Sequence, residues 1–157
     1  MHGKRATLLA ASALAATAIV LSIVSVSVAS GSKVVVHVIE HAVNDTVVDI
    51  GASGDSTGDL FTFQNAVFDE KDAKAVGSDL GSCIRVTPSK GSWQCTWTTF
   101  LADGQIVVSG PFYDTHDSVL AVLGGTGAFS GASGNMQLHC FVDHGLGKCD
   151  FIFRLNA

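Results

Sequence analysis

The chain contains little charge, little proline and little methionine. Of its 157 residues, 15% are charged, two are Pro and two are Met, and the formal net charge is −5. No cluster of Lys and Arg occurs beyond the first five residues, which excludes the basic surface of a nucleic-acid-binding protein. Apolar residues make up 47% and Gly occurs 17 times. This composition excludes a disordered chain and predicts one compact domain divided by glycine-containing turns.

The first thirty residues differ from the remainder. Lys4 and Arg5 precede an uncharged, mostly apolar run over residues 6–29, which ends in the small residues Ala29 and Ser30. A basic start, an apolar stretch and a small-residue end are typical of a secretory signal. The alternative is an uncleaved membrane anchor, because a run of this length could span a bilayer.

We therefore predict a signal peptide over residues 1–30, cleaved after Ala29 or Ser30, and a single domain over residues 31–157. The mature protein is expected to be secreted, with no membrane association after cleavage. Removing Lys4 and Arg5 makes the mature domain more acidic than the full chain, which agrees with the absence of a nucleic-acid partner.

All four cysteines lie beyond the leader, at Cys83, Cys95, Cys140 and Cys149. An even number in an exported chain predicts two disulfides. With His144-Gly145 as a hairpin loop, counting outward places Cys140 opposite Cys149 at a position where cross-strand side chains are closest. Cys83 and Cys95 flank residues 88–90 in a similar way, although that pairing needs a loop of odd length. The competing interpretation is a zinc site, but the chain lacks the close Cys-x-x-Cys pair typical of one.

The mature part is dominated by short β-branched and aromatic segments separated by Gly and Asp, with no helical pattern longer than two turns. Asp103-Gly104 is typical of a two-residue hairpin loop. Strands are expected over residues 33–41, 46–50, 60–68, 82–86, 93–101, 105–110, 118–123, 135–141 and 149–155. The pattern predicts an all-β barrel or sandwich, and a closed barrel would leave no exposed strand edges.

Several familiar chemistries lack support. The Gly-rich segment 124–127 is not followed by the Lys and Ser/Thr of a phosphate loop, so we interpret it as a tight β-turn. No Gly-x-Ser-x-Gly elbow is present. His37 and His41 would lie roughly 13 Å apart on a strand, too far to share a metal ion. Asp59 is typical of a turn or strand cap.

A set of short motifs occurs in a fixed order along the chain. They are Gly58-Asp59-Leu60, Phe63-Gln64-Asn65, Val76-Gly77, Gly81-Ser82-Cys83, Gly110-Pro111-Phe112, the segment from Leu120 to Phe129, and Gly131-Ala132-Ser133-Gly134. This arrangement resembles the allene oxide cyclase-like barrel family, and the Gly-Gly-Thr-Gly-x-Phe segment is also similar to dirigent proteins. The resemblance spans about residues 55–155. It implies an eight-stranded antiparallel up-and-down β-barrel with an apolar cavity, often assembled as a homotrimer.

The resemblance also implies an activity, in which a hydrophobic polyene or epoxide closes into a ring inside the apolar cavity. Asn65 matches the family's water-binding Asn, and Glu40 is the only Glu on the first expected strand, where the family places a catalytic carboxylate. Phe63, Phe112 and Cys83 match pocket positions, and the pocket wall also includes Phe61, which shares a strand face with Phe63. No metal or organic cofactor is implied; the expected partner is a small hydrophobic ligand.

Two hypotheses follow. In the first, the protein is a secreted small-molecule cyclase or isomerase that uses Glu40 and Asn65. In the second, it is a non-catalytic barrel stapled by disulfides, which binds a lipophilic ligand or orients a coupling reaction as dirigent proteins do. An enzyme requires an open pocket that Glu40 and Asn65 both face. A barrel filled by Phe and Trp rings would favour a structural role.

Overall fold

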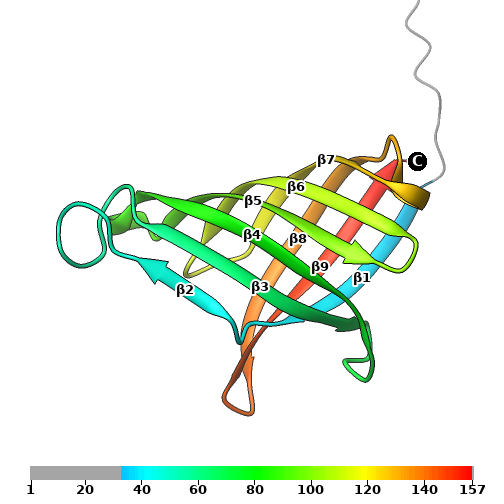
Figure 1. The fold of residues 1–157 in the computed structure, drawn as a ribbon, viewed down its shortest axis with the longest axis horizontal. Coiled ribbons are helices and arrows are strands. Elements are labelled where there is room, and N and C mark those ends of the chain that lie inside the picture. Colours follow the sequence, from blue (N-terminus) through cyan, green and yellow to red (C-terminus); the bar gives the residue numbers. More distant parts are fainter. Residues whose placement is uncertain (1–32, 157) are drawn as a thin grey trace, which may run out of the picture.

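A computed structural model describes residues 33–156, so the predicted signal peptide lies outside the described residues. The strands form a single antiparallel sheet that closes into a barrel (Figure 1). The elements are β1 (Lys33–His41), β2 (Asp45–Val48), β3 (Leu60–Asp69), β4 (Ala75–Thr87), the 3-10 turn η1 (Pro88–Lys90), β5 (Ser92–Leu101), β6 (Gly104–Tyr113), β7 (Ser118–Gly125), the 3-10 turn η2 (Gly127–Phe129), β8 (Ser133–Asp143) and β9 (Leu146–Asn156).

The barrel closes because β1 pairs with both β9 and β3. β2 also pairs with β3, further along the same edge, so β1 and β2 are two parts of one strand interrupted over residues 42–44. Counted in this way, the barrel has eight antiparallel strands, as the resemblance implied. Within residues 33–156, no helix has the length and hydropathy needed to cross a membrane.

The structure confirms the expected hairpin at His144-Gly145. Asp143 pairs with Leu146, and both loop residues have positive φ angles, 49° for His144 and 81° for Gly145. This is the backbone that a two-residue turn between twisted strands requires. The resulting register places Cys140 directly opposite Cys149, and β4 and β5 likewise bring Cys83 opposite Cys95.

The prediction of an Asp103-Gly104 loop was wrong by one residue. Leu101 pairs with Gly104, so the two loop residues are Ala102 and Asp103, and Gly104 belongs to β6. Glycine is needed at position 104 for a close approach, since a Cβ there would lie 2.0 Å from the carbonyl oxygen of Thr126.

The Gly-rich segment 124–127 packs against this same hairpin. The amide of Thr126 donates to the carbonyl of Gln105 over 3.0 Å, and the amide of Ala128 donates to the carbonyl of Asp103 over 2.8 Å. Backbone amides that would bind a phosphate in a P-loop are therefore used within the protein. This confirms the interpretation of the segment as a structural turn.

Alternation along the strands separates an inner from an outer face. On β5, Trp93, Cys95, Trp97 and Thr99 are buried, while Gln94 and Thr96 are exposed. One end of the interior is filled by side chains with almost no exposed surface: Ile106, Val108, Leu120, Met136, Phe153 and Leu155. These side chains form a packed plug at the end of the barrel where β8 begins and β9 ends.

Candidate functional site

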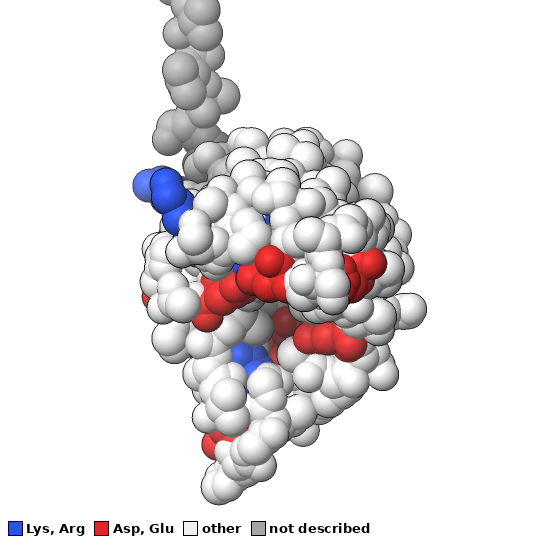
Figure 2. Space-filling view, turned by 90° about the vertical axis from the view of Figure 1, so that its left-hand side faces the viewer, with Lys and Arg blue, Asp and Glu red and all other residues white. Residues whose placement is uncertain are grey.

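The other end of the barrel contains a pocket of about 340 Å³. Figure 2 looks at this open end and shows acidic side chains around a hollow. Residues from every labelled strand except β7 contribute to its wall. The lining residues include Glu40, Asp45, Phe61, Phe63, Cys83, Cys95, Trp97, Phe112, Asp114, Leu138, Cys140, Lys148, Cys149 and Phe151. The barrel is therefore closed by packing at one end and hollow at the other.

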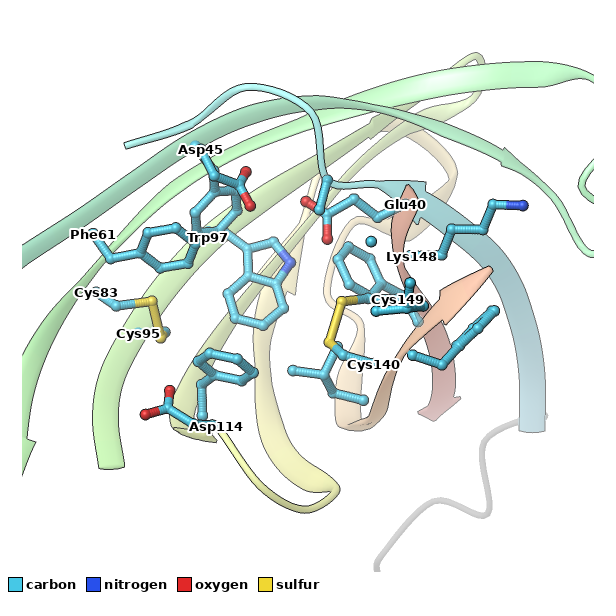
Figure 3. Close-up of a pocket in the computed structure, with 18 residues that line it drawn as sticks. Glu40, Asp45, Phe61, Cys83, Cys95, Trp97, Asp114, Cys140, Lys148 and Cys149 are labelled. Carbon is cyan, nitrogen blue, oxygen red and sulfur yellow. A yellow bond between two sulfur atoms is a disulfide. The ribbon is translucent and has the colours of Figure 1, made fainter. Parts of the chain in front are cut away.

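Aromatic rings form much of the pocket wall (Figure 3). The ring centroids of Phe61 and Phe63 lie 5.4 Å apart, those of Phe63 and Trp97 lie 5.8 Å apart, and those of Trp97 and Phe151 lie 5.5 Å apart. These separations are typical of favourable aromatic contacts. The rings are inclined to one another, by 37°, 74° and 42° in the same order, so they form a continuous apolar wall that curves around the pocket and does not fill it.

The position of the Trp97 ring depends on a glycine in the neighbouring strand. Gly81 pairs with Trp97 across β4 and β5, and a Cβ at position 81 would lie 2.2 Å from the Trp97 Cβ. No other residue could occupy this position without displacing the tryptophan. The indole Nε1–H of Trp97 has no hydrogen-bond partner among the described residues, although Trp97 is buried.

Both disulfides form part of the pocket wall. Cys83 is bonded to Cys95 and Cys140 is bonded to Cys149, with Cα separations of 4.0 and 4.1 Å. All four cysteines line the pocket. Cys83 therefore occupies the pocket position that the resemblance implied, as half of a disulfide and not as a free thiol. No cysteine among the described residues is free.

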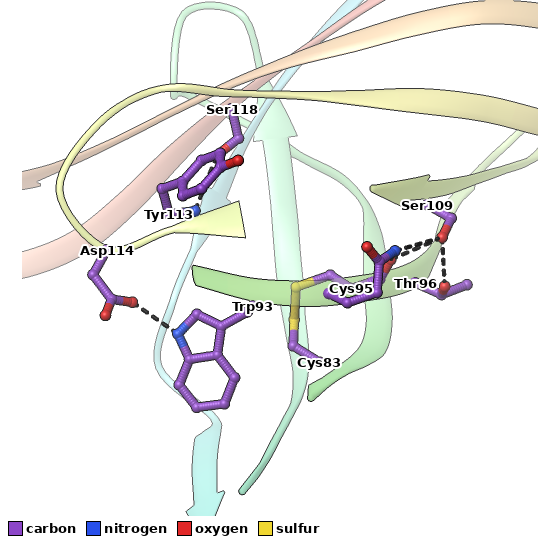
Figure 4. The surroundings of a disulfide bond; sticks show 9 residues. Cys83, Trp93, Cys95, Thr96, Ser109, Tyr113, Asp114 and Ser118 are labelled. Atoms are coloured by element: carbon purple, nitrogen blue, oxygen red, sulfur yellow. Dashed lines mark hydrogen bonds between the residues drawn. A yellow bond between two sulfur atoms is a disulfide. The ribbon is translucent and has the colours of Figure 1, made fainter. Parts of the chain in front are cut away.

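Polar groups surround the Cys83–Cys95 bond at the mouth (Figure 4). The indole Nε1–H of Trp93 donates to Asp114 over 2.8 Å. The guanidinium of Arg85 pairs with Asp114 and Asp55 and lies 4.2 Å from the centre of the Trp93 ring. These contacts join β4 and β5 to the β2–β3 and β6–β7 loops and fix the rim on this side of the pocket.

Glu40 lies at the opposite side of the pocket, near the end of β1, and only 6% of it is exposed. Its Oε1 accepts a 2.7 Å hydrogen bond from the side-chain amide of Asn65. Burial is the main cause that raises the pKa of Glu40, to about 9, and the negative charge of Asp79 raises it further. The hydrogen bond from Asn65 acts in the opposite direction.

Asn65 is the centre of the hydrogen-bond network behind Glu40. Its Nδ2 donates to Glu40 and, over 2.8 Å, to Asp45. Its Oδ1 accepts from the backbone amides of Val43 and Asn44 at 3.1 and 2.8 Å, so it holds the break between β1 and β2 in place. Asn65 is 2% exposed and does not line the pocket. Its contacts position Glu40 and Asp45, which do.

Asp79, on β4, completes the network and is fully buried. Its Oδ1 accepts from the backbone amide of Asn65 over 3.1 Å, while its Oδ2 is buried and has no hydrogen-bond partner among the described residues. Burial is the main cause that raises the pKa of Asp79, to about 6. Asn65 therefore bonds to two buried acidic residues, to Glu40 through its side chain and to Asp79 through its backbone amide.

Lys148 also lines the pocket, but its ammonium group forms ion pairs with two aspartates. The Nζ atom bonds to Asp72 over 2.6 Å and to Asp143 over 2.7 Å, and His41 contacts the other oxygen of Asp72 at 2.6 Å. Figure 3 shows the ammonium group directed away from Glu40. These ion pairs tie the β3–β4 turn to the β8–β9 hairpin.

The structure brings the predicted site residues together. Five of them line one pocket, namely Glu40, Phe61, Phe63, Cys83 and Phe112, and Asn65 lies directly behind Glu40. The sequence interpretation missed Asp79 because it began this strand at Ser82, whereas β4 begins at Ala75. With the longer strand, Asp79 would have stood out as an acid on the same face as Cys83.

Among residues 33–156, no group of three or more His, Cys, Asp or Glu side chains is arranged to hold a metal ion. The chemistry available in the pocket is that of the carboxyl groups of Glu40 and Asp45 and an aromatic wall. Such a site can bind an apolar molecule, orient it and polarise one of its oxygen atoms.

A closed antiparallel barrel with an apolar pocket at one end is the architecture of a small class of ligand-enclosing proteins. The sequence profile of the allene oxide cyclase family matches residues 33–148, and the chain belongs to this family.

Solved structures support the same fold. The chain is similar to a pyocyanin demethylase, with 24% identity and a TM-score of 0.65 over 76% of this chain and 100% of the other. It is similar to a pterocarpan synthase dirigent protein, with 18% identity and a TM-score of 0.67 over 80% and 95%. A Diels-Alderase from Streptomyces koyangensis matches with 14% identity and a TM-score of 0.60 over 81% and 70%. Identities this low establish the shared barrel alone.

Proposed function

We propose that the protein is a small-molecule cyclase or isomerase that steers ring closure of a hydrophobic polyene or epoxide in its pocket. The observation that carries this proposal is the position of Glu40, a buried carboxyl group at the end of an open, aromatic-lined pocket. Family membership and the likeness to a Diels-Alderase and a dirigent protein support it.

In this mechanism, most of the catalysis comes from positioning. The rings of Phe61, Phe63 and Phe112 would fold the apolar substrate into the geometry of one stereoisomer, and the pocket would exclude water from the reacting bonds. Glu40 would polarise the reacting oxygen. Asn65 would act as a positioning residue, because both of its amide hydrogens are donated to Glu40 and Asp45.

The test uses an allene oxide generated in the assay, with the enantiomeric composition of the cyclopentenone product as the readout. The wild-type protein is expected to give one enantiomer in excess, while the Glu40→Gln variant loses at least tenfold in rate. Glu70→Gln is the matched control, because Glu70 is the only other Glu and is exposed in the turn after β3. A racemic product with the wild-type protein would reject cyclisation of this substrate.

A second candidate is a binding or dirigent-like barrel without turnover. One observation favours it: every hydrogen-bonding position of the Asn65 side chain is occupied by a protein group, which leaves none for a substrate or its water. A neutral fluorescent probe, N-phenyl-1-naphthylamine, separates the two functions. Under this second function, the wild-type protein gives a racemic cyclopentenone and yet binds the probe, Glu40→Gln retains probe binding, and Leu138→Trp, which fills the pocket, abolishes it.

Export and assembly belong to the same proposal. Two disulfides agree with an oxidising compartment, so we propose secretion with cleavage after Ala29 or Ser30. Intact mass of the protein from culture medium tests the cleavage. Exposed apolar side chains on the outside of β4, among them Leu80 and Ile84, would be covered in a homotrimer. Light scattering coupled to gel filtration tests that assembly.

A further inference from the structure

The charged side chains that line the pocket are unevenly divided between acids and bases. Three of them, Glu40, Asp45 and Asp114, are acidic, whereas Lys148 is the only base in the described lining. Figure 2 shows the same imbalance, with acidic side chains around the hollow. A ligand therefore enters the pocket past negatively charged groups, which repel anions and attract cations.

The bases near the pocket have no charge left for an anionic ligand. Lys148 bonds to Asp72 over 2.6 Å and to Asp143 over 2.7 Å. Arg85, at the rim, is likewise held by two aspartates. Each of these cations is thus neutralised by carboxylates of the protein itself. Among the described residues of the wall, a carboxylate ligand would find no positive partner.

Glu40 and Asp45 have the opposite deficiency, because neither forms a salt bridge within residues 33–156. The side-chain amide of Asn65 donates to both, over 2.7 and 2.8 Å, so the two carboxyl groups lie close together. Figure 3 shows them turned toward each other on one side of the pocket. The second oxygen of Glu40, Oε2, accepts no hydrogen bond from the described residues. Because buried acids are normally paired, Glu40 lacks a positive partner that a ligand in the pocket could supply.

The aromatic wall suits the same charge. The face of an aromatic ring is electron-rich and attracts cations, and rings arranged around a cavity bind ammonium groups in this way. Phe63, Trp97 and Phe151 follow one another along the wall, inclined so that they curve around the pocket. A cation there would also relieve the uncompensated burial that raises the pKa of Glu40.

We infer that the pocket binds an organic cation, an apolar molecule whose ammonium group lies beside Glu40 and Asp45 and whose body lies against the aromatic wall. The inference deepens the proposed function and rests on it for the role of this cation as substrate, so the polyene or epoxide carries a basic nitrogen. A long-chain carboxylate has the wrong charge for this pocket and is excluded from it.

Three ligands with the same naphthalene body test the charge preference. They are 1-naphthylmethylammonium, the uncharged 1-naphthylmethanol and the anion 1-naphthoate, and calorimetry at pH 7 measures their affinities. The ammonium is expected to bind at least about fivefold more tightly than the alcohol, and the naphthoate more weakly than either. A smaller preference for the ammonium, including no binding of it, overturns the inference, as does a naphthoate that binds as tightly as the alcohol.

Two variants locate the charge that the ligand meets. Asp45→Asn removes one charge and keeps an oxygen that can accept from Asn65, so it is expected to weaken ammonium binding by about fivefold with little effect on the alcohol. Asp103→Asn is the matched control, because it makes the same change in net charge at an exposed position in the β5–β6 loop, away from the pocket. No loss in Asp45→Asn, or an equal loss in both variants, overturns the placement of the cation.

Leu138→Trp, which fills the pocket, should abolish binding of the ammonium, and binding that persists would place the cation outside the pocket and reject the inference. Circular dichroism checks the fold of each variant. If Leu138→Trp does not fold, competition between the ammonium and N-phenyl-1-naphthylamine on the wild-type protein replaces it. Lack of competition then rejects the inference.

These measurements involve no turnover, so they are independent of cyclisation. A preference for the ammonium in a protein that gives a racemic product rejects the proposed function alone. A preference for the alcohol or the naphthoate in a protein that gives one enantiomer in excess rejects the inference alone.

Discussion

The two ends of the barrel interior are built from the same strands but packed differently. On β9, Phe153 and Leu155 are buried in the plug, while Cys149 and Phe151 line the pocket a few residues away. On β8, Met136 belongs to the plug, and Leu138 and Cys140 belong to the pocket. One strand therefore supplies both packing and cavity, and the same residue types, Phe and Leu, occur at both levels.

The hollow end is held together by disulfides and ion pairs, whereas the plugged end is held together by packed apolar side chains. Two disulfides line its wall, and the ion pairs of Arg85 and Lys148 brace its rim. A cavity forfeits the contacts that side chains make in a packed core. Links between strands hold such an opening in shape without filling it, which explains why all four cysteines lie at this end and none in the plug.

The sharpest test of this difference compares two Phe-to-Ala substitutions. Phe153→Ala in the plug is expected to lower the free energy of unfolding by about 3–5 kcal/mol, because Phe153 is fully buried and its loss leaves a cavity. Phe63→Ala in the half-buried pocket wall is expected to cost less than half as much and to weaken binding of N-phenyl-1-naphthylamine. Urea unfolding monitors the first effect and fluorescence titration the second. Equal costs would show that the two ends are not energetically distinct.

Removal of either disulfide is the next largest effect expected. Cys83 and Cys95 are 12 residues apart and Cys140 and Cys149 are 9 apart, so the chain-entropy model gives about 3 kcal/mol for each bond. The double substitutions to Ala are compared by urea unfolding with and without a reductant. The reductant should destabilise the wild type and leave the variant lacking both bonds unchanged. A wild-type protein insensitive to full reduction would contradict this account of the hollow end.

The stability of the hollow end should also depend on pH through Glu40. Its pKa is raised from 4.5 to about 9 in the folded state, so the folded protein binds the proton more tightly than the unfolded chain. The contribution of Glu40 to stability is therefore greatest below pH 4.5 and is lost as the pH rises from 4.5 towards 9. The raised pKa of Asp79 adds a loss between 3.8 and about 6.

Glu40→Gln removes the Glu40 part of this dependence. At pH 8 the variant is expected to be more stable than wild type by on the order of 2 kcal/mol, with no difference at pH 4. Melting temperatures measured across this range test the prediction, and Glu70→Gln should follow the wild-type curve. A Glu40→Gln variant less stable than wild type at pH 8 would show that Glu40 stabilises the fold in its charged form.

The smallest effect expected comes from the two tryptophans. Trp97→Phe removes a buried N–H that has no protein partner, so it should change stability little. Trp93→Phe loses the bond to Asp114 and should cost about 1 kcal/mol of stability. Urea unfolding of both variants tests this difference, and a larger loss in Trp97→Phe than in Trp93→Phe would contradict it.

Local patterns in the sequence predicted most of the fold. Alternating apolar residues placed Trp93, Cys95 and Trp97 on the inner face, and the His144-Gly145 turn fixed the register of the adjacent disulfide. These features depend on neighbouring residues in one hairpin. The length of β4 was predicted too short, because Gly77 and Gly81 weaken a strand pattern. In the barrel, these glycines allow Phe100 and Trp97 of the next strand to approach closely.

The polar network was harder to predict because it depends on closure of the sheet. Glu40 on β1 and Asp79 on β4 both bond to Asn65 only after β3 pairs with both strands and β1 breaks after His41. Asn65 was found as a polar residue on an apolar face, but its role in holding Val43 and Asn44 required the path of the β1–β2 break. A pattern of single strands contains no information on which distant acids bond to the same residue.

Gly81 does not line the pocket, yet the residue at this position determines where the Trp97 ring of the pocket wall can lie. The bare backbone there seats the neighbouring indole, and a methyl group would press on it at 2.2 Å and move the ring. Relatives with a larger side chain at position 81 should therefore bind ligands of a different shape. Substrate selectivity can thus be changed by a residue that does not contact the substrate.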